Sequence, residues 1–509
     1  MDYLICRNFS FYEHGIAEEE MRSDDTNKVG QCPFHGRAVQ DNDNSTQYES
    51  KETWPPGPRT RFTGWSLLQS MSQDFLGALA QWKKEFGDLI YLHIWPEHEV
   101  VINDPAIARE LLVSHHENLV RWEHGVEVFS QLHGKSVLTT EGAHWYEKRQ
   151  ALQPNFTPKA VEKFLPTIES VVKRHLDTWP KQNKSWPIER YITAITMDVI
   201  ARLIFSSDLG DELDTISEAS QVLNEVANKE LYWPVITPSW LPWKWRKRKA
   251  FSIMNGLIEK HVQIRLKALQ KSDLLQKADG DLASDKPNDL MGHLLQLHQD
   301  NPKAWPLQAV RNECMTAFLA GHETVAVTLT WWLWCMASQP HAQEQARQEV
   351  QFFLQKKSSE KSGLSDLSYL NQTVKESMRL YPAAPVLMTR RSTQSFKLGQ
   401  WVIPKKTLFI IPVYLLHHDE RWFPEPEKFI PERFNPTAEK YPRGAYMPFG
   451  TGPRVCLGQH MAMTEVMVIA SLILQRYCLS MPDHTEPPVP VLQVSLRPRD
   501  ELKLNLQAS

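Results

Sequence analysis

Apolar residues recur at helical spacing along most of the chain, and strict alternation is confined to a few short stretches. The segments LIYLHI (89–94) and EVVIN (99–103) alternate and predict one hairpin, residues 395–412 predict another, and 492–498 predicts a further strand. The helical spacing predicts helices over 70–86, 104–115, 142–152, 158–180, 190–206, 250–270, 306–338, 341–356 and 366–380. The fold class is therefore expected to be mainly α with a minor β-sheet region.

The distribution of polar residues predicts one folded domain with a tail. Residues 13–53 are polar and lack apolar periodicity, and a proline-rich WPPGPR segment follows them. We therefore expect a flexible polar tail over 1–53 and a single domain over 54–509. The polar stretch 270–289 is expected to be a surface loop between helices.

Composition excludes several classes of protein. The chain is 42% hydrophobic and 23% charged, with a formal net charge of -3, which gives no reason to expect a nucleic acid partner. Its six cysteines form no CxxC pair, so neither a disulfide framework nor an all-cysteine zinc site is expected. Near the N-terminus, Asp2 and Arg7 do not fit a signal peptide. We expect a soluble, cytoplasmic protein.

The segment FGTGPRVCLG (449–458) contains the strongest chemical signal. Gly450, Gly452 and Gly458 surround Cys456, and glycine lets a backbone approach a flat ligand closely. An apolar helical pattern follows, so the sulfur is expected at a helix N-terminus, where it would be held as thiolate. A cysteine peptidase would also need a thiolate, but that reading does not explain the glycines, phenylalanine and arginine together.

This loop resembles the haem-binding loop of the cytochrome P-450 superfamily, the haem-thiolate monooxygenases. The matching residues are Phe449, Gly450, Gly452, Arg454, Cys456 and Gly458. The resemblance implies that Cys456 is the axial iron ligand of haem b (iron protoporphyrin IX), that Arg454 pairs with a propionate and that Phe449 packs near the sulfur. It also implies a haem between a long central helix and the helix after the Cys loop, as in soluble bacterial-type members without a fused reductase.

The segment AFLAGHETVAV (317–327) provides an acid–alcohol pair. Ala320 and Gly321 are small and would leave room above a cofactor, and Glu323 and Thr324 follow them. In a helix, the Thr324 hydroxyl can donate back to the carbonyl of Ala320 and open a groove. The resemblance implies that dioxygen binds beside Thr324 and that Glu323 helps to deliver protons.

KESMRLYP places Glu376 and Arg379 on one helix face, and FIPERFNP brings a further arginine, Arg433. The resemblance implies that these three residues form a buried network behind the haem loop. Their role would be structural.

Two further segments are candidates for propionate contacts. In HWYEKRQ, Trp145 and Arg149 stand four residues apart on one helical face. The resemblance implies that both donate to haem propionates and that Arg390 or Arg391 adds another contact. The spacing does not decide between these two arginines, and we prefer Arg390.

The expected substrate is lipophilic, for example a fatty acid, a terpenoid or a steroid-like molecule. Segments 121–132 and 489–494 are further candidate walls, and Arg121, Glu123 or His124 would either anchor a polar end or lie in a solvated loop. The pocket residues expected nearest the iron are Ala317, Ala320, Gly321, Val386 and Leu387.

The expected electron donors follow from the nucleotide-binding motifs, which the sequence does not show. No Walker A or GxGxxG nucleotide loop is visible, so electrons are expected from a ferredoxin or flavodoxin with its NAD(P)H reductase. Lys148, Arg149 and Arg443 are candidates for a positive docking face, or belong to a solvated surface. Residues 233–249 combine tryptophans with a basic run and either touch a membrane surface or pack on the core.

Two rival functions use the same cysteine. A haem-thiolate peroxygenase or isomerase needs no external electrons, but such enzymes tend to lack the acid–alcohol pair. A non-enzymatic haem sensor or electron carrier would need no apolar cavity above the iron.

Overall fold

The computed structural model describes residues 54–509 except 60–62, 232–239, 280–288 and 358–362. The expected tail, 1–53, lies outside the described residues, and so do residues 233–239 of the tryptophan-containing segment 233–249. The larger helices are α1 (Trp65–Gln73), α2 (Phe75–Phe86), α3 (Pro105–Arg109), α4 (Glu123–His133), α5 (Gly142–Leu152), α6 (Pro158–Glu162), α7 (Leu165–Asp177), α8 (Ile188–Phe205), α9 (Leu213–Leu231), α10 (Pro242–Asp279), α11 (Leu290–Asp300), α12 (Leu307–Ser338), α13 (Pro340–Lys357), α14 (Ser368–Leu380), α15 (Val413–His417) and α16 (Gln459–Arg476). The expected mainly α fold is confirmed.

Helix boundaries follow local capping. The expected helix 70–86 divides because the Asp74 carboxylate accepts the Gly77 N–H at 2.9 Å and starts α2. Asp104 caps α3 in the same way, accepting from Ile107 at 2.8 Å. The expected helix 158–180 also divides, into α6 and α7.

Four helices were not predicted, among them the short α15. Residues 123–133, expected as part of a loop, form α4, and both α9 and α11 are additional. The expected loop 270–289 is helical through Asp279, the last residue of α10. Polar residues on exposed helix faces mask the apolar period in such segments.

The strands are β1 (Leu89–Ile94), β2 (Glu97–Ile102), β3 (Leu119–Arg121), β4 (Gln182–Pro187), β5 (Arg390–Ser392), β6 (Phe396–Leu398), β7 (Trp401–Ile403), β8 (Leu408–Ile410), β9 (Tyr477–Ser480), β10 (Pro490–Leu492), β11 (Leu496–Pro498) and β12 (Lys503–Ala508). The main sheet has the order β1-β2-β8-β5-β3, and the others are β4-β12-β9, β6-β7 and β10-β11. The first expected hairpin is confirmed, with Leu89 opposite Ile102. The second is confirmed only as β6-β7, because the fully buried β8 pairs in parallel with β2.

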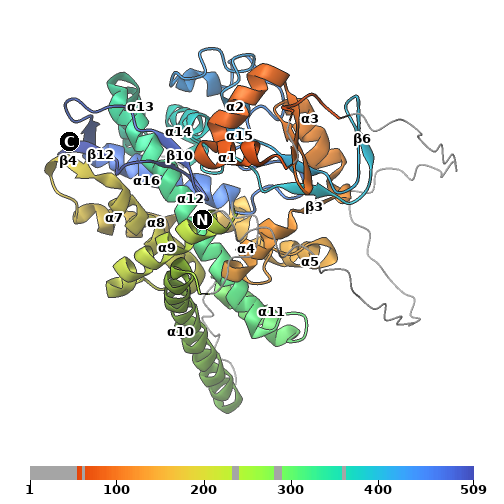
Figure 1. Ribbon diagram of the computed structural model, residues 1–509. Coiled ribbons are helices and arrows are strands. Elements are labelled where there is room, and N and C mark those ends of the chain that lie inside the picture. The colour runs from red at the N-terminus through yellow and green to blue at the C-terminus, as the bar shows by residue number, and fades with distance from the viewer. Residues whose placement is uncertain (1–53, 60–62, 232–239, 280–288, 358–362) are drawn as a thin grey trace. The chain divides into compact units, whose positions relative to one another are not determined.

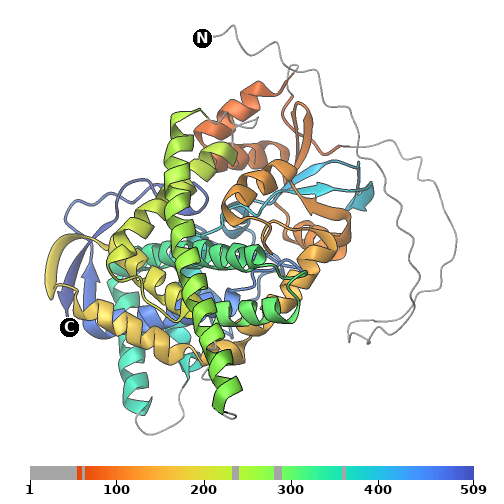
Figure 2. The same ribbon diagram turned by 90° about the horizontal axis from the view of Figure 1, so that it is seen from below.

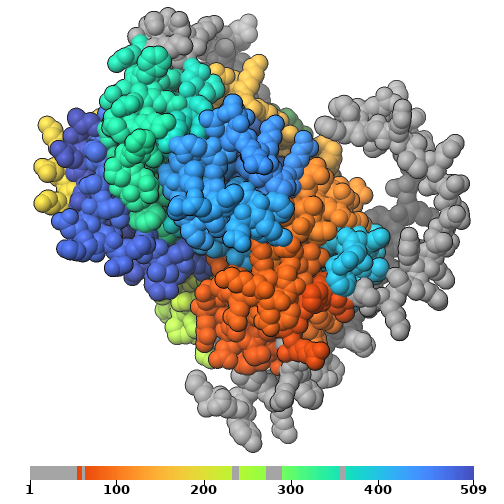
Figure 3. Space-filling model, turned by 90° about the horizontal axis from the view of Figure 1, so that it is seen from above, coloured from red at the N-terminus to blue at the C-terminus, as the bar shows by residue number. Residues whose placement is uncertain are grey.

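The long helix α12 is the centre of the fold. It packs against α8, α10, α14 and α16, and crosses the molecule in Figure 1. Figure 2 shows α10 running across the lower face, and Figure 3 shows the blue residues that follow α14 between α13 and the orange N-terminal helices. Among the helices of the described residues, none has the length and hydrophobicity that crossing a bilayer requires.

Candidate functional site

The Cys456 loop precedes α16 and has a backbone that requires glycine. Gly450 and Gly452 have φ angles of 74° and 79°. A Cβ at position 452 would lie 2.2 Å from the carbonyl oxygen of Leu112, so a side chain cannot be accommodated there. The Cys456 N–H donates to the carbonyl of Phe449 at 3.0 Å, which closes the loop.

The Cys456 thiol is accessible although protein surrounds it. It is exposed, yet desolvation raises its pKa, and the two observations agree if the sulfur faces a space enclosed by the protein. A hydrogen bond from the Gly458 backbone and the charge of Arg149 oppose this rise without reversing it. Without a bound cation the sulfur therefore favours the thiol form, and a bound metal ion would favour the expected thiolate.

A network of two fully buried residues, Glu376 and Arg379, and the partly buried Arg433 supports this loop from behind. The Arg379 guanidinium makes two hydrogen bonds of 2.8 Å to the Glu376 carboxylate, and Arg433 Nε donates to the same carboxylate at 3.3 Å. Arg379 also donates to the carbonyl of His417 at 2.9 Å. His417 Nε2 in turn accepts the Met447 N–H at 3.0 Å, and burial lowers the pKa of His417 to about 3, so this nitrogen stays a neutral acceptor. The chain before the Cys loop is thereby fixed to the predicted Glu–Arg–Arg group.

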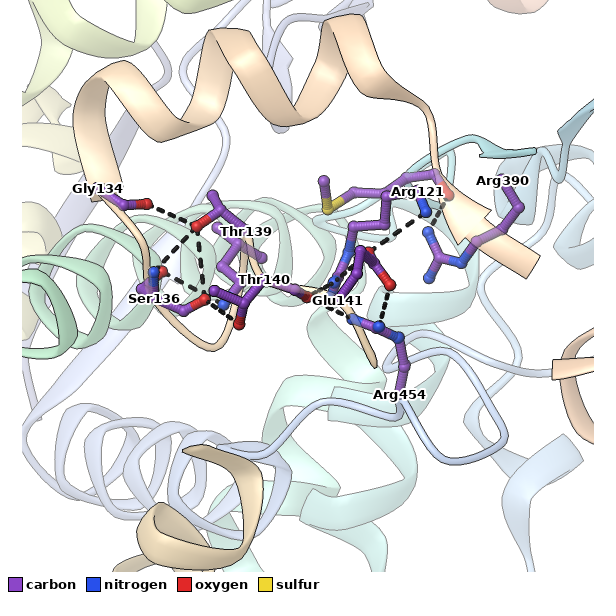
Figure 4. A network of polar contacts seen from close by, with 10 residues as sticks. Arg121, Gly134, Ser136, Thr139, Thr140, Glu141, Arg390 and Arg454 are labelled. Carbon is purple, nitrogen blue, oxygen red and sulfur yellow. Dashed lines mark hydrogen bonds and ion pairs between the residues drawn. The ribbon is translucent and has the colours of Figure 1, made fainter. Parts of the chain in front are cut away.

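A cluster of arginines lies beside the loop (Figure 4). Arg121 and Arg454 both bind Glu141, and both donate to the carbonyl of Thr140, at 3.3 and 3.2 Å. Arg390 lies next to them and donates to a backbone carbonyl. Burial and the neighbouring arginines lower the pKa of Arg390 to about 9, and burial with the charge of Arg121 lowers that of Arg454 to about 10. Glu141 neutralises one of three positive charges, which leaves an electrostatic site for an anion.

Helix α5 brings Trp145 and Arg149 next to the arginine cluster and the Cys456 loop. The Arg454 guanidinium stacks on the Trp145 ring, 4.2 Å from its centroid. Arg149 Nη1 donates to the carbonyl of Val455 at 2.7 Å. Lys148, expected on a docking face, instead binds the buried Glu313 at 2.8 Å.

The geometry distinguishes Arg390 from Arg391. Arg391 makes two 2.8 Å hydrogen bonds to Glu97 and one of 2.6 Å to Glu123. Its guanidinium is therefore engaged on the other side of β5, whereas Arg390 lies in the arginine cluster.

Helix α12 has an accessible stretch inside an otherwise buried region. Ala320 and Thr324 are exposed, although most neighbouring α12 residues are buried. The Thr324 hydroxyl donates to the Ala320 carbonyl at 2.9 Å, as predicted. Gly321 lies against α8 instead, since a Cβ there would be 2.8 Å from Ile200 Cδ1. Ala317 is half-buried and packs against the main core.

The Glu323 side chain does not share the exposure of Thr324. It is buried and bound by Ser495 and Arg497 of the C-terminal hairpin. These two contacts hold the acid of the expected pair against β11.

The segment after α14 brings Leu387 next to the Cys456 loop, whereas Val386 packs against the core residues of α1, α2 and β1. Both are half-buried, and a Cβ at Gly450 would be 3.7 Å from Leu387 Cδ2. The Leu387 N–H donates to the carbonyl of Ile411, the residue after β8, at 3.1 Å, which fixes this segment beside the end of that strand.

Sequence reasoning missed four residues of the site. Arg121 was considered only as an anchor or a solvated residue, and Glu141, Ser495 and Arg497 were not considered. The alternating burial of β3 could have placed Arg121 inward, but this strand has only three residues. The other three carry no local signal.

Comparisons with known proteins agree with this geometry. Residues 55–506 match the family model described as Cytochrome P450. Cytochrome P450 4c21 of Blattella germanica is 26% identical over 460 residues, covering 87% of this chain and 90% of the relative. Cytokinin hydroxylase of Arabidopsis thaliana is 28% identical over 450 residues, with coverages of 87% and 85%, and cytochrome P450 4A14 of Rattus norvegicus is 29% identical over 387 residues, with coverages of 74% and 75%. These relatives come from eukaryotes and do not support the expected bacterial type.

Proposed function

Since this chain belongs to the cytochrome P450 family and is a haem-dependent monooxygenase, we propose that it inserts one oxygen atom from O2 into a lipophilic small molecule such as a fatty acid, a terpenoid or a steroid-like molecule. The expected family, enzyme class and haem cofactor are thereby confirmed. The single-domain boundaries 54–509 and the roles of the individual residues stay predictions.

The described residues fit haem. Two uncompensated arginine charges suit two propionates, and the buried Nε of Arg121 has no hydrogen-bond partner within the described residues. The accessible sulfur of Cys456 suits an axial ligand. Arg390, Arg454, Arg149 and Trp145 would hold the propionate edge, and Phe449 would pack near the sulfur.

Haem held by a thiolate supplies the activation of dioxygen and the transfer of oxygen. The protein's own residues would bind the ligands and exclude water. The Thr324 hydroxyl, fixed on the Ala320 carbonyl, is placed to hydrogen-bond a polar ligand at the accessible side of α12. Apolar Val386 and Leu387 would bind the substrate and exclude water.

The electron donor is a separate protein in our proposal. We retain the predicted ferredoxin or flavodoxin with its NAD(P)H reductase, and a diflavin P450 reductase is the alternative donor to test. The engagement of Lys148 by Glu313 leaves Arg443, which is exposed, as the better candidate for docking.

Peripheral membrane contact through the described part of 233–249 is also proposed. Trp240 and Trp245 are 75% and 74% exposed, which suits a membrane interface. Lys244 and Lys247 both bind Glu230 at 2.6 Å, so part of the basic run serves the α9–α10 contact.

The observation that carries the proposal is the accessibility of Ala320 and Thr324, one helical turn apart on an otherwise buried part of α12. We expect fatty acids, terpenes or steroids to shift the optical band of the purified ferric protein, and the binding compounds to be hydroxylated when NADPH, O2 and a reductase are added. A shift without turnover by any donor, together with turnover by hydrogen peroxide alone, would favour the peroxygenase alternative. No shift with any compound would favour the haem sensor.

Arg390→Ala is expected to weaken haem retention by roughly 10- to 100-fold, the scale of one charge-assisted hydrogen bond. Arg391→Ala is the matched control, because it loses the contacts to Glu97 and Glu123 but should keep haem affinity. Transfer of haem to excess apomyoglobin measures both. Equal haem loss from the two variants would contradict the assignment of Arg390.

A further inference from the structure

The Glu323 carboxylate is held by two residues near the C-terminus of the chain. Its Oε1 accepts from Ser495 Oγ at 2.7 Å and from Arg497 Nε at 2.8 Å, and its Oε2 accepts from Arg497 Nη2 at 2.5 Å. Ser495 is 3% exposed and Glu323 is 6% exposed. The carboxylate is thus fixed by a two-pronged guanidinium contact and a hydroxyl within the protein interior.

Arg497 is shared with a second acid. Its Nη1 donates to Glu189 Oε1 at 2.6 Å, in the first turn of α8. Glu189 and Arg497 keep about a fifth of their side-chain surface exposed, whereas Glu323 is buried. A continuous polar path therefore leads from partly exposed Glu189 to the residue that precedes Thr324.

The same hairpin forms a candidate wall of the substrate pocket. Leu492 of β10 pairs with Leu496 of β11, which leaves Gln493, Val494 and Ser495 at the turn. The Leu496 carbonyl accepts from Trp331 Nε1 of α12 at 2.7 Å. The pocket wall and the acid of α12 are therefore parts of one hydrogen-bonded unit.

We propose that Arg497 and Ser495 are positioning residues that keep Glu323 ionised and held against β11, so that proton supply beside Thr324 depends on the β10–β11 hairpin. This inference rests on the proposed monooxygenase function for the use of the proton. The contact itself does not depend on which substrate or electron donor the enzyme uses.

The charges around the pair support this role. Desolvation alone would raise the pKa of Glu323, but Arg497, His322 and Ser495 together lower it below its ordinary value. Desolvation raises the pKa of Glu189, with Arg497 opposing and Glu323 and Glu501 adding to the rise. The charge of Glu225 also raises the pKa of Arg497. Native Glu323 therefore stays ionised at neutral pH and takes a proton only below the ordinary carboxyl range.

The first test needs neither substrate nor electron donor. Infrared difference spectra between the haem-loaded native protein and Glu323→Gln follow the carboxyl group of Glu323 through a pH titration. In Arg497→Met we expect its pKa to rise by about two units or more, because burial is no longer opposed. Arg497→Lys should restore most of the native value, Ser495→Ala should raise it less, and Arg499→Gln, an exposed neighbour on the same chain segment, should leave it unchanged.

The second test measures turnover. With dodecanoic acid as the probe and whichever donor system, ferredoxin, flavodoxin or P450 reductase, supports native turnover, Arg497→Met should divert several-fold more NADPH into hydrogen peroxide and shift the pH profile of product formation. In a Glu323→Gln background, Arg497→Met should add no further shift. If the native enzyme oxidises dodecanoic acid with none of these donor systems, the fatty-acid proposal fails, while the infrared titration still decides the present inference.

The inference is overturned if Arg497→Met unfolds more easily but leaves the Glu323 titration unchanged. An unchanged titration of Glu323 in Ser495→Ala would show that Ser495 is not a positioning residue. If the Met variant does not fold, Arg497→Gln, which removes the charge but keeps a polar side chain, gives the same decision.

Discussion

Cys456→Ser is expected to lower monooxygenase turnover by at least about 10³-fold and to remove the thiolate signature from the ferrous carbonyl spectrum. The reason is that the hydroxyl of serine stays protonated and donates too little electron density to promote O–O cleavage. The positive φ angles at Gly450 and Gly452 do not depend on the sulfur, so the loop should keep its shape.

Cys478→Ser is the matched control, because this cysteine is also exposed but lies on β9. It should keep both the spectrum and the activity. If Cys456→Ser retains a thiolate spectrum, or if Cys478→Ser loses it, the proposed ligand is wrong.

Arg379→Ala is expected to cost about 3–5 kcal/mol in the free energy of unfolding, because it strands the buried Glu376 carboxylate. That cost is a large part of the total stability of about 5–15 kcal/mol that folded proteins have. Since Arg379 also binds the carbonyl of His417, whose ring holds Met447, haem retention should fall as well.

Urea unfolding followed by tryptophan fluorescence measures the first effect, and the haem absorbance of the purified protein measures the second. Lys173→Ala is the control, because this side chain is about half exposed and its pair with Glu169 is worth less than about 1 kcal/mol. A loss below about 1 kcal/mol in Arg379→Ala would contradict the structural role of the network.

Local patterns predicted those parts of the site that lie close together in the sequence. The expected central helix 306–338 agrees with Leu307–Ser338, and the back-bond of Thr324 follows from helical geometry alone. The Cys456 loop was also visible, because its glycines and arginine lie within ten residues.

Contacts between distant segments could not be predicted in this way. The partner of Glu323 is Arg497, and neither residue carries a local sign of the other. The environment of Gly321 could not be predicted either, because a small residue can face a cofactor or a neighbouring helix. The position of Ile200 shows that Gly321 lies against α8. For the same reason the parallel pairing of β8 with β2 was missed.

That pairing has a consequence for biosynthesis. Glu99 pairs with Leu408, so the inner edge of β2 stays unmatched until residue 408 has left the ribosome. Sheets that need such distant strands assemble slowly, and their unpaired strand edges are prone to aggregation until they do. The nascent chain therefore has a long interval in which chaperones are needed, and expression at reduced temperature should improve the soluble yield.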